Sequence, residues 1–287
     1  MTTVSELLAS ATRLGDVEAR HEAEILLGHA LDRSRAWLYA HADFVPEGAA
    51  QQRFARLLAA RARGEPVAYL IGRRGFWTLD LEVTPDVLIP RAETELLVEL
   101  ALERIPRDVE CKVADLGTGS GAIALALASE RPRTRVLATD ASTAALEVAR
   151  GNAARLRIHN VEFANGDWCA ALGSRHFDVV VSNPPYIADR DAHLGLGDLR
   201  FEPSSALASG SDGLDAMRSI VAQARSHLVP GGWLLVEHGH DQGAAVRGLF
   251  GLNGYCGIET CRDIELRERV TLAQVEPVAN RIGELQD

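Results

Sequence analysis

The sequence predicts an α/β protein whose larger part is a mainly parallel sheet, preceded by a small helical domain. From residue 112 onward, apolar strand-like runs alternate with segments of helical periodicity. Such βα alternation is typical of a parallel sheet with helices on both faces. The first 70 residues carry helical patterns alone. Ligands of parallel sheets bind beyond the carboxyl ends of the strands, so we search for the site there.

Composition excludes several classes of protein. The chain has 287 residues, of which 47% are hydrophobic and 24% charged, as in ordinary globular proteins. A net charge of −10, with 8 arginines and 9 acidic residues in the first 70, argues against tight binding to a phosphate backbone. No apolar run reaches the roughly 20 residues of a membrane span, and the N-terminus lacks a secretory signal pattern. The four cysteines show no C-x-x-C spacing, which favours reduced thiols over zinc or disulfides. We therefore expect a cytoplasmic protein that uses no metal.

The first 70 residues are predicted to form a helical domain. Thr3 and Glu6 have the spacing of a capping box, in which each side chain bonds the backbone of the other. Apolar residues recur at helical spacing over Arg20–Leu31 and Gln51–Ala62. No pattern in this domain is typical of a cofactor site or of catalytic chemistry.

Residues 71–90 are predicted to form a β-hairpin linker. Strand-like residues there are interrupted by the turn sequence Thr84-Pro85-Asp86. A helix is expected to begin near Arg91 and to continue to about Arg104. Residues 91–287 are therefore assigned to the α/β domain.

The α/β domain is predicted to contain seven strands. The expected strands are Lys112–Leu116, Arg135–Thr139, Val161–Ala164, Phe177–Ser182, Trp233–Glu237, Gly257–Thr260 and Val270–Gln274. The expected helices between them are Gly121–Ser129, Ser142–Leu156, Gly213–Leu228 and Gln242–Leu252.

A glycine-rich loop, Asp115–Ala122, follows the first of these strands. Its glycines allow a sharp turn and the close approach of a ligand, and free N–H groups at the following helix start can bind an anion. Asp140 ends the next strand, where its carboxylate can accept hydrogen bonds from both ribose hydroxyls. The loop also fits the dinucleotide fingerprint, so by itself it leaves a nicotinamide enzyme open.

The sequence Asn183-Pro184-Pro185-Tyr186 follows the fourth strand. The prolines lack N–H donors and stiffen the turn, which presents two acceptors, the Asn183 Oδ1 and the Pro184 carbonyl. Beside the flat ring of Tyr186, two acceptors suit a planar NH₂ group. A stiff surface turn is the alternative. The position at a strand's carboxyl end, next to the glycine loop, favours a site that holds such an NH₂ group and directs its nitrogen lone pair at an electrophilic carbon.

The glycine loop together with Asn-Pro-Pro-Tyr resembles the S-adenosylmethionine-dependent methyltransferases. Five stretches resemble one family of them in particular, the HemK/PrmC family of peptide-chain release factor glutamine methyltransferases. They are Gly64–Gly72, Phe76–Glu99, Ser182–Ile187, Gly197–Leu207 and Leu234–Gly243. The resemblance covers essentially the whole chain. Its specific part is Ile-Pro-Arg-x-x-Thr-Glu and Arg-Phe-Glu-Pro. Ala92 departs from the family's usual proline at a helix start.

This resemblance implies a Rossmann-like class I methyltransferase domain, S-adenosylmethionine as cofactor, and class I release factors with their Gly-Gly-Gln loop as partners. Stable binding to nucleic acid or membrane is not expected, and a monomer is the default expectation. The residues implied to bind cofactor are Gly117, Thr118, Gly119, Ser120, Gly121, Asp140, Trp168 and Asn183. The residues implied to bind the substrate glutamine are Asn183, Pro184, Pro185 and Tyr186, with Asn183, Pro184 and Tyr186 catalytic.

Two other classes of function stay open on the residues alone. A nucleic-acid base methyltransferase uses the same acceptors on a flipped base but needs a basic recognition surface. A non-catalytic binding module needs the sheet without the complete motif set. No general base is assigned, because an N-methylated amide cation loses its proton readily. Asp167, Glu237 and His238 are interpreted as ordinary polar residues of loops and strand ends.

Overall fold

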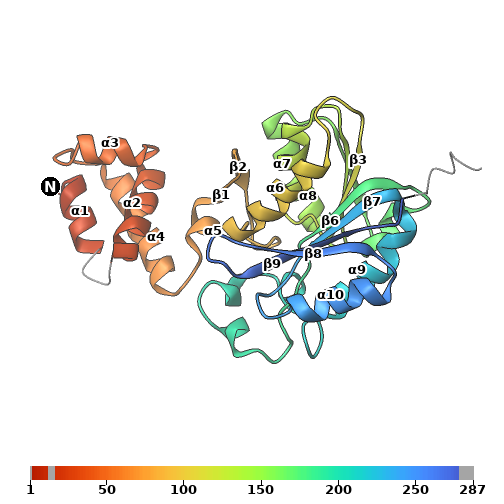
Figure 1. The fold of residues 1–287 in the computed structure, drawn as a ribbon. Helices are drawn as coiled ribbons and strands as arrows, with labels where there is room; N and C mark the ends of the chain where they lie inside the picture. The colour runs from red at the N-terminus through yellow and green to blue at the C-terminus, as the bar shows by residue number, and fades with distance from the viewer. Residues whose placement is uncertain (1, 12–16, 278–287) are drawn as a thin grey trace, which may run out of the picture. The chain divides into compact units, whose positions relative to one another are not determined.

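The computed structural model describes residues 2–11 and 17–277, and the chain divides into two compact units (Figure 1). The first unit is Met1–Arg73 together with Leu196–Phe201, and the second is Arg74–Gly195 together with Glu202–Asp287. The sequence predicted a helical domain over residues 1–70 and assigned residues 91–287 to the α/β domain. The segment Leu196–Phe201 therefore belongs to a unit in which the sequence did not place it.

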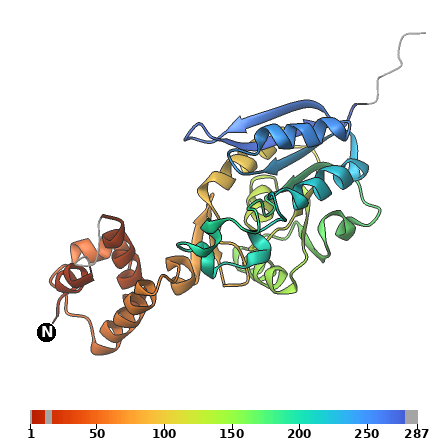
Figure 2. The same cartoon turned by 90° about the horizontal axis from the view of Figure 1, so that it is seen from below.

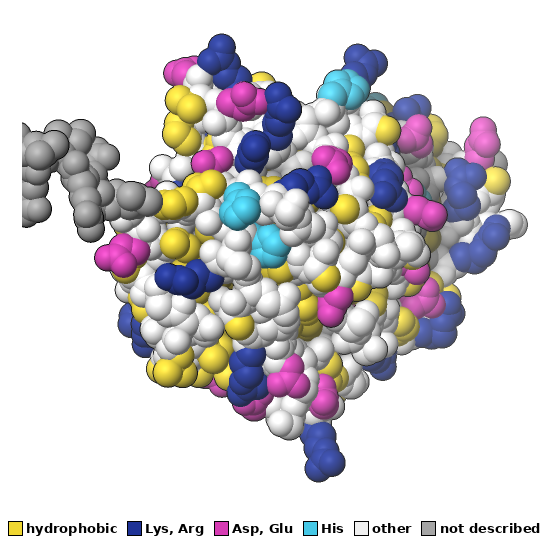
Figure 3. All heavy atoms as spheres, turned by 90° about the vertical axis from the view of Figure 1, so that its right-hand side faces the viewer, with side chains coloured by type: hydrophobic (Ala, Val, Ile, Leu, Met, Phe, Trp, Pro, Cys, Tyr) yellow, Lys and Arg dark blue, Asp and Glu magenta, His cyan; other side chains and the backbone are white. Residues whose placement is uncertain are grey.

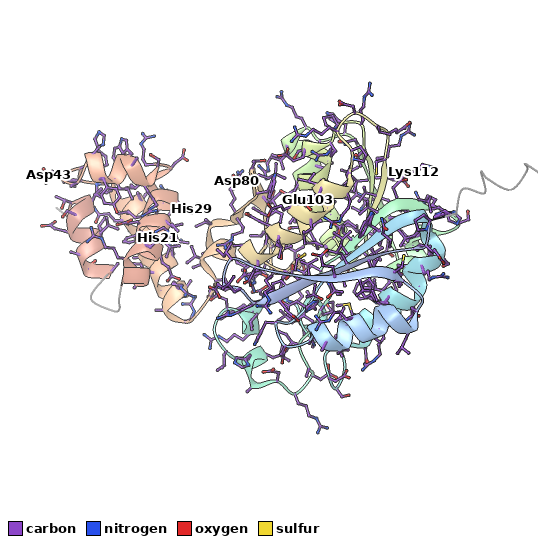
Figure 4. The ribbon with its side chains drawn as sticks, viewed as in Figure 1. His21, His29, Asp43, Asp80, Glu103 and Lys112 are labelled. Carbon is purple, nitrogen blue, oxygen red and sulfur yellow. The ribbon has the colours of Figure 1, made fainter. Side chains whose placement is uncertain are left out.

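The first unit is helical. Its helices are α1 (Val4–Ala11), α2 (Val17–Leu31), α3 (Arg35–Ala40), α4 (Gly48–Ala62) and α5 (Val67–Ile71). The capping box forms, since Thr3 N donates to Glu6 Oε2 at 2.9 Å and Glu6 N donates to Thr3 Oγ1 at 3.2 Å. Leu26, Leu27 and Phe54 are buried in its core, whereas His21 and His29 lie on the exposed side of α2 (Figure 4). The apolar residues that recur at helical spacing in the sequence thus form the core of this unit.

Residues from two distant parts of the sequence meet inside the first unit. Arg61 Nη1 pairs with Asp198 Oδ1 at 3.0 Å, and Arg200 Nη2 donates to the Arg63 carbonyl at 2.7 Å. These contacts attach the segment Leu196–Phe201 to the end of α4 and the residue after it.

The hairpin of β1 (Arg73–Phe76) and β2 (Leu79–Glu82) packs against the α/β unit. Glu82 N donates to Asn152 Oδ1 at 2.7 Å, and Asn152 Nδ2 donates back to the Glu82 carbonyl at 2.9 Å. Asn152 lies in α8 (Thr143–Leu156) and is fully buried. The region predicted as a linker is for the most part a fixed component of the second unit.

The second unit is built on a seven-stranded sheet of order β5-β4-β3-β6-β7-β9-β8. Five strands run parallel, and β9 pairs antiparallel with both of its neighbours. The strands are β3 (Lys112–Leu116), β4 (Arg135–Asp140), β5 (Val161–Asn165), β6 (Phe177–Ser182), β7 (Leu228–Glu237), β8 (Cys256–Arg262) and β9 (Glu268–Gln274). The predicted mainly parallel sheet is confirmed.

Helices cover both faces of this sheet. One face packs against α6 (Glu95–Arg104), α7 (Ala122–Glu130) and α8, and the other against α9 (Asp215–Ala224) and α10 (Gly243–Leu252). Figure 2 shows α9 and α10 on the near side of the sheet. Successive side chains of β6 point to opposite faces of the sheet, so Val179 and Val181 pack in the core on one face and Val180 in the core on the other. No helix in the described ranges is long and apolar enough to cross a membrane.

Candidate active site at the carboxyl ends of the parallel strands

A cavity of about 450 Å³ lies within the second unit, at the carboxyl ends of four neighbouring strands. The segments after β3, β4, β5 and β6 supply much of its wall, as expected for a parallel sheet. These wall residues are Gly117–Ser120 after β3, Asp140–Ser142 after β4, Gly166–Trp168 after β5, and Asn183 with Pro185 after β6. Most residues that the sequence assigned to cofactor and substrate therefore line one cavity.

The glycine loop is held in place by the neighbouring strand. Gly117 N and Thr118 N both donate to the Thr139 carbonyl, at 2.9 and 2.8 Å. Gly117 and Gly119 have φ of +74° and +56°, values that a residue with a Cβ adopts only with strain. A Cβ added to Gly117 would stand 3.3 Å from the Trp168 ring, so the loop passes close beneath that ring.

Asp140 supports the same loop. Its Oδ2 accepts a hydrogen bond from Gly119 N at 2.9 Å, and its Oδ1 accepts one from Ser142 N at 2.9 Å. An ionised carboxylate has about four lone-pair positions, so Asp140 can accept further hydrogen bonds from a ligand in the cavity.

Trp168 has a backbone conformation that is rare for its residue type. Its φ is +42°, although it is not a glycine. It begins the short 3-10 helix η3 (Trp168–Leu172) and packs in part against the core around α9. Strain of this kind is often found at ligand sites, and here it sets a large flat ring in the cavity wall.

Asn183 stands where three elements converge. Its Nδ2 donates to Thr94 Oγ1 at 3.0 Å, and Thr94 ends the 3-10 helix η2 (Ala92–Thr94). Glu237, the last residue of β7, lies beside the side chains of Thr94 and Asn183, which favour its charged form. The amide nitrogen of Asn183 is thus engaged by the protein, whereas its side chain still lines the cavity.

Three predicted site residues do not line the cavity, namely Gly121, Pro184 and Tyr186. A Cβ on Gly121 would stand 3.0 Å from Leu125 and 3.3 Å from Ala149, so this glycine serves the close packing of α7 on α8. Pro184 is buried. Tyr186 is mostly buried, and burial raises its pKa to about 12.

The chain after Pro185 turns away from the cavity. The Tyr186 carbonyl accepts a hydrogen bond from Gln242 Nε2 at 3.0 Å. Ile187 then pairs in strand fashion with Ala208. The Tyr186 ring is absent from the cavity lining, and its expected stacking on a substrate amide stays a prediction. A sequence pattern cannot show this direction of the backbone.

The sequence did not identify the other wall of the cavity, which residues 85–94 supply. Arg91 lines the cavity and forms an ion pair with Glu202, whose side chain is fully buried. Glu202 Oε2 also accepts a hydrogen bond from Ile89 N at 3.2 Å. Ile-Pro-Arg and Arg-Phe-Glu-Pro, which the sequence singled out without a function, are thereby joined to one another at the cavity.

Two buried carboxyl groups lie next to the cavity. Burial raises the pKa of Asp115 to about 7, although hydrogen bonds from Thr118 and Ala124 oppose the shift. Burial likewise raises the pKa of Glu237 to about 7 against hydrogen bonds from Thr94 and Asn183. His238 is also buried, which lowers its pKa, and it bonds the Gly239 carbonyl and Thr271 away from the cavity lining. Across residues 2–11 and 17–277 there is no cluster of three or more side chains suited to a metal ion.

Comparison with known proteins gives the same two-part division. Residues 4–72 match the family model described as PrmC N-terminal domain, and residues 92–210 match the one described as Methyltransferase small domain. The release factor glutamine methyltransferase of Xylella fastidiosa is 58% identical over 93% of this chain and 96% of its own. The one from Pseudomonas aeruginosa is 51% identical over 96% of this chain and 99% of its own.

A solved structure agrees with the fold of the second unit. A methyltransferase from Pyrococcus furiosus superposes with a TM-score of 0.53 and 18% identity, covering 78% of this chain and 98% of the other. At this identity the likeness extends to the fold alone.

Proposed function

Because this chain belongs to the family of release factor glutamine methyltransferases, we propose that it methylates the side-chain amide nitrogen of a release factor glutamine. The glutamine is that of the Gly-Gly-Gln motif in class I factors, and the methyl donor is S-adenosylmethionine. The observation that carries the proposal is the single cavity in which the glycine loop, Asp140 and Asn183 meet.

The residues of the cavity fit this methyl donor. A Cβ at Gly117 would stand 3.3 Å from the Trp168 ring, so glycine lets the loop and the ring lie close together, and the position of a Cβ at Gly119, which lines the cavity, is open space. Asp140 retains acceptor positions for the two ribose hydroxyls. Trp168 offers a flat face to the adenine, and Gly117–Gly119 lie where the amino-acid end would bind. When bound, S-adenosylmethionine supplies a methyl group on a sulfonium, which is a strong electrophile.

The protein's contribution to the chemistry is to hold the amide nitrogen. Amide nitrogen is a weak nucleophile, since its lone pair is delocalised into the carbonyl. The Asn183 Oδ1 accepts one N–H of the substrate amide, which directs the nitrogen and stabilises positive charge developing on it. The Pro184 carbonyl stays the second acceptor that the motif predicts, although Pro184 does not line the cavity. The product cation is acidic enough to lose its proton without a dedicated base. We therefore assign no general base, and this includes Glu237, which lies beside Thr94 and Asn183.

The two units divide the task. The helical unit lacks cofactor motifs, and its sequence is near neutral, which suits contact with a protein surface more than with a phosphate backbone. On the face of the molecule in Figure 3, basic and acidic side chains are interspersed. We propose that the helical unit recognises the release factor, that nucleic acid and membrane are not stable partners, and that the enzyme is a monomer. Four free cysteines support a cytoplasmic location.

A labelled methyl-transfer assay tests the proposal. The purified chain is incubated with methyl-labelled S-adenosylmethionine and a class I release factor, and the label is located by peptide mass spectrometry. We expect the label on the glutamine of Gly-Gly-Gln and none on a factor in which alanine replaces that glutamine. DNA, RNA and a short Gly-Gly-Gln peptide serve as parallel substrates. Preferential labelling of DNA or RNA would assign the chain to nucleic-acid base methylation instead.

A further inference from the structure

We propose that Thr94 and Glu237 are positioning residues, which fix the side-chain amide of Asn183 with its oxygen directed into the cavity. This inference rests on the proposed function, since the amide oxygen is the acceptor for the substrate amide. The sequence assigned no function to Thr94 and interpreted Glu237 as an ordinary polar residue at a strand end.

The three side chains are brought together by separate elements of the fold. Ser182 of β6 pairs with Val236 of β7, so Asn183 and Glu237 occupy the next positions at the carboxyl ends of adjacent parallel strands. Thr94 comes from η2, about 90 residues earlier in the chain, and is itself buried. Asn183 Nδ2 donates to its hydroxyl at 3.0 Å.

With Glu237 ionised, the chemistry of the three groups sets the directions of their hydrogen bonds. The carboxylate then only accepts, so the Thr94 hydroxyl, which lies beside it, donates its hydrogen to Glu237. The hydroxyl oxygen is then left as an acceptor for Asn183 Nδ2. This nitrogen is the only donor of the Asn183 side chain, so it is the amide atom that an ionised Glu237 favours on its side. Rotation of the amide by 180° would place its oxygen against two acceptors, so the oxygen is kept on the side of the cavity.

The buried carboxyl group of Glu237 lowers the stability of the folded state. Its side chain is 1% exposed, and its Oε2 has no hydrogen-bond partner among the described residues. Arg269 of β9 favours its charge, whereas Glu93 of η2 opposes it, and Tyr186 lies nearby. A buried carboxylate with an unpaired oxygen lowers stability, which a role in positioning Asn183 explains.

Removal of the Thr94 hydroxyl tests the arrangement. Thr94→Val keeps the shape of the side chain, and we expect it to lower kcat about tenfold, as for loss of one orienting hydrogen bond. The Kd for S-adenosylmethionine, measured by calorimetry, should stay within about twofold, because the glycine loop is untouched. Thr94→Ser retains the hydroxyl and should keep kcat within about threefold. Thr134→Val is the matched control, a buried threonine at the opposite end of the sheet, and should leave kcat unchanged.

A double-mutant cycle separates positioning from a general structural role. Asn183→Ala alone is expected to lower the rate roughly a hundredfold. In that background Thr94→Val should have no further effect, because the amide that it orients is gone. An equal tenfold loss in both backgrounds, or full activity of Thr94→Val in the native background, would overturn the inference.

Glu237→Gln provides a second, independent variant, with unfolding temperatures recorded for all proteins. Its amide can donate to Thr94, which permits the reversed chain of hydrogen bonds, so kcat should again fall about tenfold at unchanged cofactor Kd. Full activity in Glu237→Gln contradicts the inference. Failure of the native protein to methylate a release factor would instead reject the proposed function, so the two failures are distinguishable.

Discussion

Asp115 carries a buried carboxyl group whose protonation couples folding to pH. It is fully buried, accepts from Thr118 Oγ1 at 2.7 Å and from Ala124 N at 3.2 Å, and burial raises its pKa from 3.8 to about 7. Between these two values the folded state binds more protons than the unfolded state. The free energy of unfolding therefore falls as pH rises through about 4 to 7, and the contribution of Glu237 has the same sign.

Replacement of Asp115 by asparagine should weaken this dependence. The amide oxygen of Asp115→Asn still accepts from Thr118 and Ala124, but the side chain no longer titrates. We expect the difference in unfolding free energy between pH 5 and pH 8, measured by urea denaturation, to be smaller than in the native protein. Glu110→Gln removes an exposed carboxylate near the same strand and should leave the difference unchanged. An identical pH profile for Asp115→Asn would contradict the assignment.

Individual site residues were predictable where the chemistry is local. The glycine loop, Asp140, Trp168 and Asn183 follow strand ends directly, and the fold brings them to one cavity. Thr94 and Arg91 were not identified, since their role depends on contacts with Asn183 and Glu202, about 90 and 110 residues later. Tyr186 was expected at the substrate because of its place in the motif; it is mostly buried near Glu237 and Arg91 and is absent from the cavity lining, so its role stays a prediction.

At the scale of the helices, replacement of glycine by alanine should have opposite effects on stability at two positions, Gly121 and Gly151. Gly121 precedes α7 with φ +86°, and an added Cβ would meet Leu125 and Ala149. Gly121→Ala should lower the free energy of unfolding by about 2 kcal/mol through backbone strain and overpacking. Gly151 lies exposed inside α8, with open space around an added Cβ. Gly151→Ala should raise stability by roughly 0.5–1 kcal/mol, because alanine favours the helix.

Urea denaturation of the two variants beside the native protein measures both effects. The slope of unfolding free energy against urea concentration should be the same in all three proteins. The substitutions would then change the stability and not the surface exposed on unfolding. Equal stability of Gly121→Ala and Gly151→Ala would show that the contact between α7 and α8 adapts without strain.

Also at the scale of elements, the predicted bounds agree with the structure where a strand is one continuous apolar run. They differ where prolines, glycines or polar residues interrupt the run. The bounds of β3 agree with the prediction, since this short buried strand ends directly at the glycine loop. The strand β7 begins at Leu228 instead of Trp233, because Pro230, Gly231 and Gly232 concealed its first half. The helix expected over 213–228 ends as an α-helix at Ala224 and continues as one 3-10 turn. Periodicity alone does not distinguish these two kinds of helix.

The proposed division between recognition and chemistry belongs to the whole molecule. Deletion of residues 1–70 should leave the Kd for S-adenosylmethionine within about twofold, and this measurement also shows that the second unit remains folded. The kcat/KM for a complete release factor should fall at least about tenfold, since contacts remote from the reacting nitrogen are lost. Activity on a short Gly-Gly-Gln peptide should change far less. Unchanged activity of the deleted form on the complete factor would exclude recognition by the helical unit.

The segment Leu196–Phe201 has a consequence for the order in which the protein forms during synthesis. The five helices are translated first, yet the segment that completes their unit follows about 120 residues after Arg73. Until Asp198 and Arg200 leave the ribosome, Arg61 lacks its pair with Asp198 and the Arg63 carbonyl lacks its donor. The last step in assembling the N-terminal unit therefore waits until β3, β4, β5 and β6 have all been made.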